Sequence, residues 1–132
     1  MPKQILLCDD EIHIVRAAEF KLRRAGYDVR CASNGEEGWA EIMRSKPDVL
    51  ITDCQMPCLD GLGLCKRVRE HEATRDLPVL MLTAKGYEIM EQQTAKDLDI
   101  LAIIAKPFSP RDLLNRVEAI LGPATLVASA EA

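Results

Sequence analysis

Short apolar segments alternate along the chain with longer segments in which apolar residues recur at every third or fourth position. Four of the short segments are continuous, at residues 5–8, 49–52, 79–82 and 100–105. Continuous runs of this length predict strands that are buried on both faces, as in a parallel sheet. Residues 27–31 instead alternate apolar and polar side chains, which predicts an edge strand with one wetter face.

Helical periodicity fills the intervals between the predicted strands and continues after the last one. The predicted helices span residues 11–25, 35–45, 60–71, 87–97 and 110–121. We expect Ser33 or Asn34 to cap the second helix and Ser109 to cap the last one, where Pro110 suits the first helical position. A strand followed by a helix five times over predicts an α/β domain in which helices cover both faces of a parallel sheet.

The bulk composition fits a single globular domain and argues against nucleic acid and membrane as its partners. The 132 residues are 48% hydrophobic and 29% charged, with a formal net charge of -4. This acidic balance argues against general affinity for nucleic acid, so we expect no direct DNA binding. No apolar run approaches the ~18 residues of a membrane span and no signal-peptide pattern is present, so we expect a cytoplasmic protein with no membrane partner. We predict one domain over residues 1–122 and a flexible tail over residues 123–132.

The chain has five cysteines, Cys8, Cys31, Cys54, Cys58 and Cys65. The number is odd and no secretory signal precedes them, so a disulfide framework is not expected. The spacing of the last three does not fit a structural zinc pair. We therefore favour packing in the apolar core over metal binding for the cysteines.

Polar residues that could bind a ligand or react with one stand where the predicted strands end. They are Asp9, Asp10, Asp53, Thr83 and Lys106. Because the carboxyl ends of parallel strands meet at one edge of the sheet, these side chains should converge. Three clustered carboxylates repel one another unless a cation such as Mg²⁺ neutralises them, and a lysine suits a phosphate. An aspartate in such a pocket can attack phosphorus and form an acyl phosphate.

These residues occur within motifs that resemble the receiver domain of two-component response regulators, over nearly the whole chain. The matching pieces are Asp9-Asp10, the D-x-x-M-P-x-x-D-G stretch from Asp53 to Gly61, Thr83-Ala84 and Lys106-Pro107-Phe108. The resemblance implies a flavodoxin-like, doubly wound (βα)5 fold with five parallel strands in the order 2-1-3-4-5. It also implies signalling through a conformational switch, not turnover of a substrate.

The resemblance assigns a role to each site residue. Asp53 is expected to accept a phosphoryl group from a sensor histidine kinase or a phosphotransfer protein. Mg²⁺ or Mn²⁺ would be held by Asp10, Asp53 and the backbone carbonyl of Gln55, with Asp9 acting through water.

The remaining assignments concern the switch. Thr83 is expected to move towards the phosphoryl group, and Lys106 to pair first with Asp53 and then with phosphate. Pro107 is expected to follow a cis peptide bond. A downstream protein would bind the face formed by the fourth helix, the fifth strand and the fifth helix, at roughly residues 86–121.

The sequence departs from the family pattern at two places. Ile103 stands three residues before Lys106, where the family usually has an aromatic side chain. The glycine that is common before the fifth strand is also missing, because residues 98–101 read Leu-Asp-Ile-Leu. We expect the turn at residues 98–101 to have a different shape.

Other functions stay open on the sequence alone. A pseudo-receiver would keep the fold and act as a docking module without phosphorylation, and Ile103 is the feature that favours it. A phosphatase with an aspartyl-phosphate intermediate would need a second aspartate where Gln55 stands. A flavin carrier would need a phosphate-binding loop after the first strand, which is absent.

Plainer structural roles are also open for several of these residues. Asp53 and Thr83 could be ordinary turn residues, and Asp9 or Asp10 could cap the first helix. The basic run at residues 66–69 is most simply the solvated face of a helix.

Overall fold

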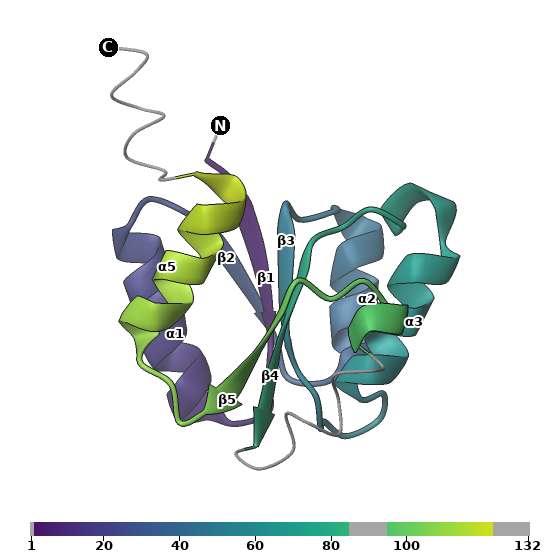
Figure 1. Ribbon diagram of the computed structural model, residues 1–132, viewed down its shortest axis with the longest axis horizontal. Coiled ribbons are helices and arrows are strands. Elements are labelled where there is room, and N and C mark those ends of the chain that lie inside the picture. The colour runs from purple at the N-terminus through teal and green to yellow at the C-terminus, as the bar shows by residue number, and fades with distance from the viewer. Residues whose placement is uncertain (1, 85–94, 123–132) are drawn as a thin grey trace.

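The computed structural model describes residues 2–84 and 95–122. Its core is one parallel sheet with the strand order β2-β1-β3-β4-β5 (Figure 1). The strands are β1 (Gln4–Cys8), β2 (Asp28–Ala32), β3 (Val49–Asp53), β4 (Val79–Ala84) and β5 (Ala102–Lys106). The predicted doubly wound fold and its strand order are therefore confirmed, including β2 as an edge strand.

Helices cover both faces of this sheet. They are α1 (Ile12–Arg24), α2 (Gly35–Arg44), α3 (Gly61–Glu70), the short 3-10 helix η1 (Glu72–Thr74) and α5 (Pro110–Leu121). Helices α1 and α5 lie on one face, and α2 and α3 lie on the other (Figure 1). Residues 95–97 are helical, whereas the rest of the helix predicted over 87–97 lies outside the described residues, as does the predicted tail at 123–132.

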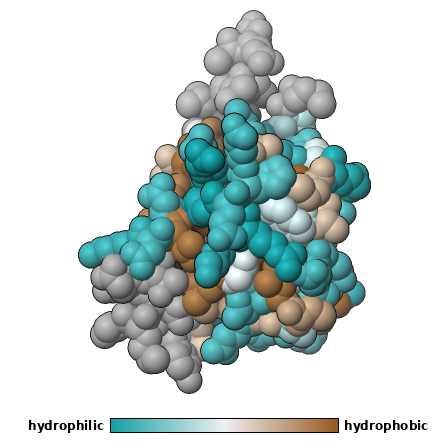
Figure 2. All heavy atoms as spheres, turned by 90° about the vertical axis from the view of Figure 1, so that its right-hand side faces the viewer, coloured by the Kyte–Doolittle hydropathy of each residue, from teal (hydrophilic) through white to brown (hydrophobic). Residues whose placement is uncertain are grey.

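Alternate residues of the central strands feed two separate apolar layers. Ile5 and Leu7 of β1 pack in one layer with Leu22 of α1 and Leu113 of α5. Their neighbours Leu6 and Cys8 point into the other layer, which includes Ile42 of α2 and Leu64 of α3. Burial on both faces explains the continuous apolar runs of the inner strands. The outer surface over α2 and α3 is mostly hydrophilic, with small separate hydrophobic areas (Figure 2).

Side-chain caps explain where three of the helices begin. Asn34 accepts a hydrogen bond from the backbone N–H of Glu37 at 2.8 Å, and Ser109 accepts one from Asp112 at 3.0 Å. Asp60 accepts one from Gly63 at 2.7 Å. Each contact satisfies a backbone N–H that has no partner within its own helix.

The strand predicted over 100–105 is wrong in its start and in its burial. β5 begins at Ala102, and Leu101 just before it is 55% exposed. Within β5 only Ile104 is buried. The physical reason is position, because β5 pairs with β4 alone and forms the second edge of the sheet. A short apolar run does not distinguish an inner strand from an outer one.

The solvated face predicted for residues 66–69 is wrong for Arg69. Its Nε donates to the carbonyl of Leu98 at 2.7 Å and its Nη2 to that of Asp99 at 3.2 Å. Its Nη1 donates to the carbonyls of Arg75 and Leu77 at 2.8 and 2.7 Å. One guanidinium thus ties α3 to the segment before β4 and to the turn before β5.

The turn before β5 adopts a left-handed conformation without glycine. Asp99 has φ of 57°, a region that aspartate tolerates better than most side chains. The missing glycine is thus replaced by an aspartate whose carbonyl Arg69 holds.

The cysteines divide between core and surface. Cys8, Cys54 and Cys65 are buried, as predicted, whereas Cys31 and Cys58 are exposed, so the core interpretation is wrong for these two. Within the described part of the chain no helix combines the length and apolar character that crossing a bilayer requires.

Candidate functional site

The strands deliver all five polar residues to one edge of the sheet, at the lower end of Figure 1. Asp9 and Asp10 follow β1, and Asp53 ends β3. Thr83 lies near the end of β4, and Lys106 ends β5. Strands β1 and β3 are neighbours, and the chain continues outward from them in opposite directions, so the cluster lies at the switch point of the strand order.

The three aspartates form a compact acidic group. Asp9, Asp10 and Asp53 each offer a carboxylate oxygen, and these oxygens lie within 4.8 Å of one another. Asp9 is 2% exposed and Asp53 is 6% exposed, whereas Asp10 is exposed. The group is therefore buried on one side and open to solvent on the other.

This acidic group fits a hard divalent cation. Carboxylate oxygens are the ligands that Mg²⁺ prefers, and a solvent-facing side leaves room for its retained waters. The buried Oδ2 of Asp9 accepts no hydrogen bond from the described residues. A buried carboxylate oxygen without a hydrogen bond is costly to the chain and is suited to an outside ligand.

Lys106 balances part of the negative charge. Its Nζ lies 2.9 Å from Oδ2 of Asp9 and 3.2 Å from Oδ2 of Asp53, and it donates a hydrogen bond to Oε1 of Glu11 at 2.7 Å. Glu11 was missed by the sequence reasoning, because a contact between residues 95 positions apart leaves no periodic signal. Its place directly after the aspartate pair was the available hint.

Charge and burial shift the proton affinities of this group. The pKa of Asp53 is raised to about 6 by burial and by repulsion from Asp9, against the opposing attraction of Lys106 and a hydrogen bond from the backbone of Cys54. For Lys106 burial opposes the charge, but the hydrogen bond to Glu11, the close contact with Asp9 and the attraction of Asp9 and Asp53 outweigh burial and raise the pKa of Lys106. Lys106 therefore stays cationic in the folded protein.

Close backbone packing fixes the position of Asp53. The N–H of Cys54 donates to the carbonyl of Leu82 at 2.8 Å, and the N–H of Gly61 donates to the carbonyl of Cys54 at 2.9 Å. A Cβ atom on Gly61 would lie 2.0 Å from the backbone oxygen of Asp53. The start of α3 can approach the end of β3 this closely because residue 61 has no side chain.

Four other residues predicted for the site lie on β4, on β5 and in the loops after β3 and β5. Gln55 is exposed in the loop after β3, and Thr83 is buried. Ile103 is half-buried in the apolar layer beside α2 and α3, and it pairs in register with Met81, two residues before Thr83. Thr83 and Ile103 thus lie on the same face of the sheet. The peptide bond between Lys106 and Pro107 is cis.

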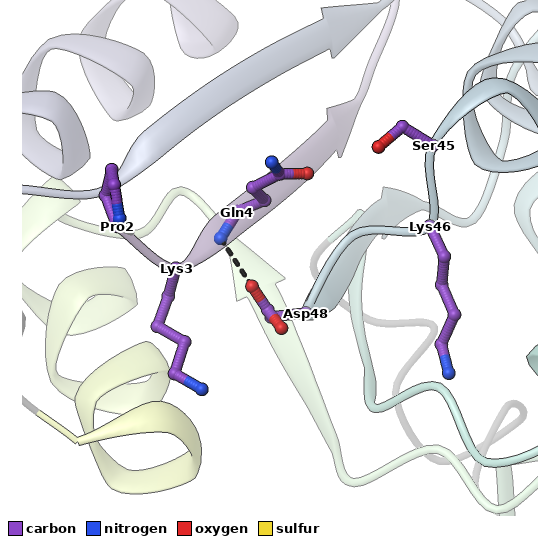
Figure 3. A pocket seen from close by; sticks show the side chains of 6 residues that line it. All are labelled: Pro2, Lys3, Gln4, Ser45, Lys46 and Asp48. Carbon is purple, nitrogen blue, oxygen red and sulfur yellow. Dashed lines mark hydrogen bonds between the residues drawn. The ribbon is translucent and has the colours of Figure 1, made fainter.

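A different kind of pocket lies at the opposite edge of the sheet. It measures about 330 Å³ and is lined by Pro2, Lys3, Gln4, Ser45, Lys46 and Asp48 (Figure 3). Its one carboxylate, on Asp48, accepts a hydrogen bond from the backbone N–H of Gln4 at 2.7 Å. This pocket shares no residue with the acidic group.

Comparison with known proteins gives the same family at every level. The sequence model of the response regulator receiver domain matches residues 5–118. A curated relative is the alkaline phosphatase synthesis transcriptional regulatory protein PhoP of Bacillus subtilis, 42% identical over 121 residues that make up 92% of this chain and 49% of PhoP. The chain spans about half the length of the curated relatives it matches.

Solved structures agree. The chemotaxis response regulator CheY4 of Vibrio cholerae superposes with a TM-score of 0.84 at 30% identity, over 91% of this chain and 99% of CheY4. A protein from Chloroflexus aurantiacus superposes with a TM-score of 0.85 at 43% identity, over 92% of this chain and 98% of that protein. With this fold, this strand order and the family model over most of its length, the chain belongs to the family of response regulator receiver domains of two-component systems.

Proposed function

We propose that this domain, over residues 1–122, accepts a phosphoryl group on Asp53 and passes the signal on through a change of its surface. The observation that carries the proposal is the convergence of three carboxylates and a lysine in one half-buried group at the carboxyl ends of the strands. The acidic group alone would attract a cation, and the lysine alone would attract an anion. Together they suit a phosphoryl group that arrives beside a metal ion.

Asp53 is the proposed nucleophile because its carboxylate ends a buried strand and faces Lys106. One of its oxygens attacks phosphorus while the bond from phosphorus to the donor breaks. The donor keeps the electron pair, and a histidine imidazole that leaves in this way takes up a proton. The product is an acyl phosphate on Asp53.

The chain's own residues would hold a divalent ion and the incoming group. Asp10, Asp53 and the backbone carbonyl of Gln55 are the proposed direct ligands, with Asp9 acting through water. Bound Mg²⁺ or Mn²⁺ supplies neutralisation of the negative charge that gathers on the phosphoryl oxygens.

Thr83 and Lys106 are the proposed residues that read the new group. Lys106 donates to a phosphoryl oxygen, and the hydroxyl of Thr83 donates to another after a small movement. Phosphorylation would bias an existing equilibrium between two surface states. Ile103 lies on the same face of the sheet as Thr83 and would move with it as an aliphatic substitute for an aromatic side chain.

The proposed partners follow from this chemistry. A sensor histidine kinase or a phosphotransfer protein supplies the phosphoryl group, and a downstream protein reads the face that includes β5 and α5, within residues 86–121. The domain would catalyse its own phosphorylation and dephosphorylation without being a turnover enzyme.

Incubation of the purified protein with Mg²⁺ and a small phosphodonor tests the proposal. We expect the intact mass to rise by one phosphoryl group in the wild-type protein and in Asp48→Asn, which alters a carboxylate at the opposite edge of the sheet. The gain should be lost in Asp53→Asn and when the metal is chelated. An unchanged wild-type mass under all conditions would instead support the docking module without phosphorylation.

A further inference from the structure

Glu11 plays no part in the proposed phosphoryl transfer, yet its carboxylate contacts Lys106, the cation of the described site. It occupies the N-cap position of α1, but its side chain makes no capping hydrogen bond. Its Oε1 instead accepts the 2.7 Å hydrogen bond from Nζ of Lys106. The side chain of Glu11 thus contacts the end of β5 and does not cap its own helix.

Lys106 is shared among three carboxylates that differ strongly in exposure. The side chains of Asp9 and Asp53 are 0% and 8% exposed, whereas that of Glu11 is 58% exposed. The ammonium lies 2.9 Å from Oδ2 of Asp9 and 3.2 Å from Oδ2 of Asp53 as ion pairs, and it donates its 2.7 Å hydrogen bond to Glu11. A new oxygen beside Asp53 would therefore compete with three carboxylates for one ammonium group.

A phosphoryl group on Asp53 draws Lys106 towards its own oxygens and so weakens at least one of these three contacts. Asp9 is the costly one to abandon, because its side chain is fully buried and its Oδ2 has the ion pair with Lys106 but no hydrogen bond. Glu11 is the cheap one, because an exposed carboxylate regains its hydration when the pair breaks. The greater exposure of the Glu11 side chain thus makes the contact between Glu11 and Lys106 the one that breaks most easily.

We propose that Glu11 is a positioning residue that holds Lys106 in the resting domain and releases it to the phosphoryl group. On release, Lys106 keeps its proton and exchanges the Glu11 carboxylate for a phosphoryl oxygen, and no covalent bond changes. This inference rests on the proposed function, because it assumes that Asp53 accepts the group. It adds that uptake is opposed by a competing ion pair on the same lysine.

The first test is the affinity for beryllofluoride, which stands in for the phosphoryl group on Asp53, measured with saturating Mg²⁺. Glu11→Gln weakens the competing pair, so we expect binding to tighten about 1.5- to fivefold, the range of a partly exposed ion pair. Glu70→Gln is the matched control. It removes the same charge from an exposed glutamate at the last residue of α3, away from the site, and should bind as the wild type does.

The possible results separate the two proposals. Equal or weaker binding by Glu11→Gln, with a wild-type protein that binds and is phosphorylated, overturns the role of Glu11 and leaves the proposed function standing. A wild-type protein that neither binds beryllofluoride nor takes up a phosphoryl group overturns both.

The second test needs no metal and addresses the resting contact itself. Urea unfolding of Glu11→Gln, Lys106→Met and the double variant forms a double-mutant cycle. We expect the combined change in the folding equilibrium constant to be about 1.5- to fivefold smaller than the product of the single changes. The same cycle with Glu70→Gln should show no coupling. Equal coupling in both cycles, or none in the first, overturns the proposed contact.

Discussion

Carboxylates at the amino ends of the strands, here called the amino edge, differ in their bonding from carboxylates at the carboxyl ends, here called the carboxyl edge. At the amino edge, Asp48 accepts a hydrogen bond from the N–H of Gln4 (Figure 3). The N–H of Asp48 in turn donates to the carbonyl of Gln4 at 2.8 Å. At the carboxyl edge, Oδ2 of Asp9 has an ion pair with Lys106 but no hydrogen bond, and the pKa of Asp53 is raised. A carboxylate that the backbone satisfies stabilises the fold. One that the chain leaves unsatisfied is held ready for a ligand, at a cost in stability.

The largest effect is expected where the carboxyl edge is packed most tightly. Gly61→Ala should lower the free energy of unfolding by about 3 kcal/mol, because the new methyl group would meet the backbone of Asp53 and backbone atoms yield little. Denaturant unfolding measures the change. Gly63→Ala is the control, since its methyl group would meet the flexible end of the Leu59 side chain and alanine favours a helix. A similar loss of stability in both variants would show that the close contact of Gly61 with the backbone of Asp53 is not what makes Gly61→Ala costly.

The second effect has the opposite sign. Asp53→Asn should raise the free energy of unfolding of the metal-free protein by about 1 to 3 kcal/mol near neutral pH. The pKa of Asp53 is raised from 3.8 to about 6 in the folded protein, so the folded state holds a proton that the unfolded state has lost. Stability is therefore fully present below the lower value and is lost as the pH rises through the higher one.

Urea unfolding in the presence of a chelator, over a series of pH values, checks this dependence. The gain of Asp53→Asn over the wild type should vanish below about pH 4 and level off above about pH 7. A gain that is the same at every pH would show that Asp53 ionises equally easily in both states. The comparison of the two edges would then lose its electrostatic basis.

Much of the carboxyl edge could be predicted from the sequence because strand ends are local features. Apolar runs locate the strands, and their parallel order brings the residues that follow them to one edge. The contacts of Glu11 and Arg69 could not be predicted this way. Each joins residues far apart in the chain, at a position where a charged side chain is ordinary. The start of β5 at Ala102 was not predicted for a related reason, because Leu101 is apolar and still exposed.

Bound Mg²⁺ should offset part of the free-energy cost of the clustered carboxylates at the carboxyl edge. When free Mg²⁺ reaches ten times its Kd, the wild-type protein should gain about 1.4 kcal/mol in unfolding free energy. Asp53→Asn should gain less, because it offers one carboxylate fewer. Thermal unfolding at increasing Mg²⁺ measures both. Asp48→Asn, which alters the other edge, should gain as much as the wild type; an equal gain in all three proteins would place the ion elsewhere.

The smallest effect is expected at the amino edge, where it tests the other half of the comparison. Asp48→Ala should lower the unfolding free energy by about 1 kcal/mol, because the N–H of Gln4 loses its acceptor in a half-buried position. Asp48→Asn keeps a side-chain oxygen and should cost much less. Neither variant should change phosphoryl uptake or the response to Mg²⁺. If Asp48→Ala instead stabilised the metal-free protein, as we expect of Asp53→Asn, the two edges would be alike. Satisfaction by the backbone would then not be what separates a structural carboxylate from one held for a ligand.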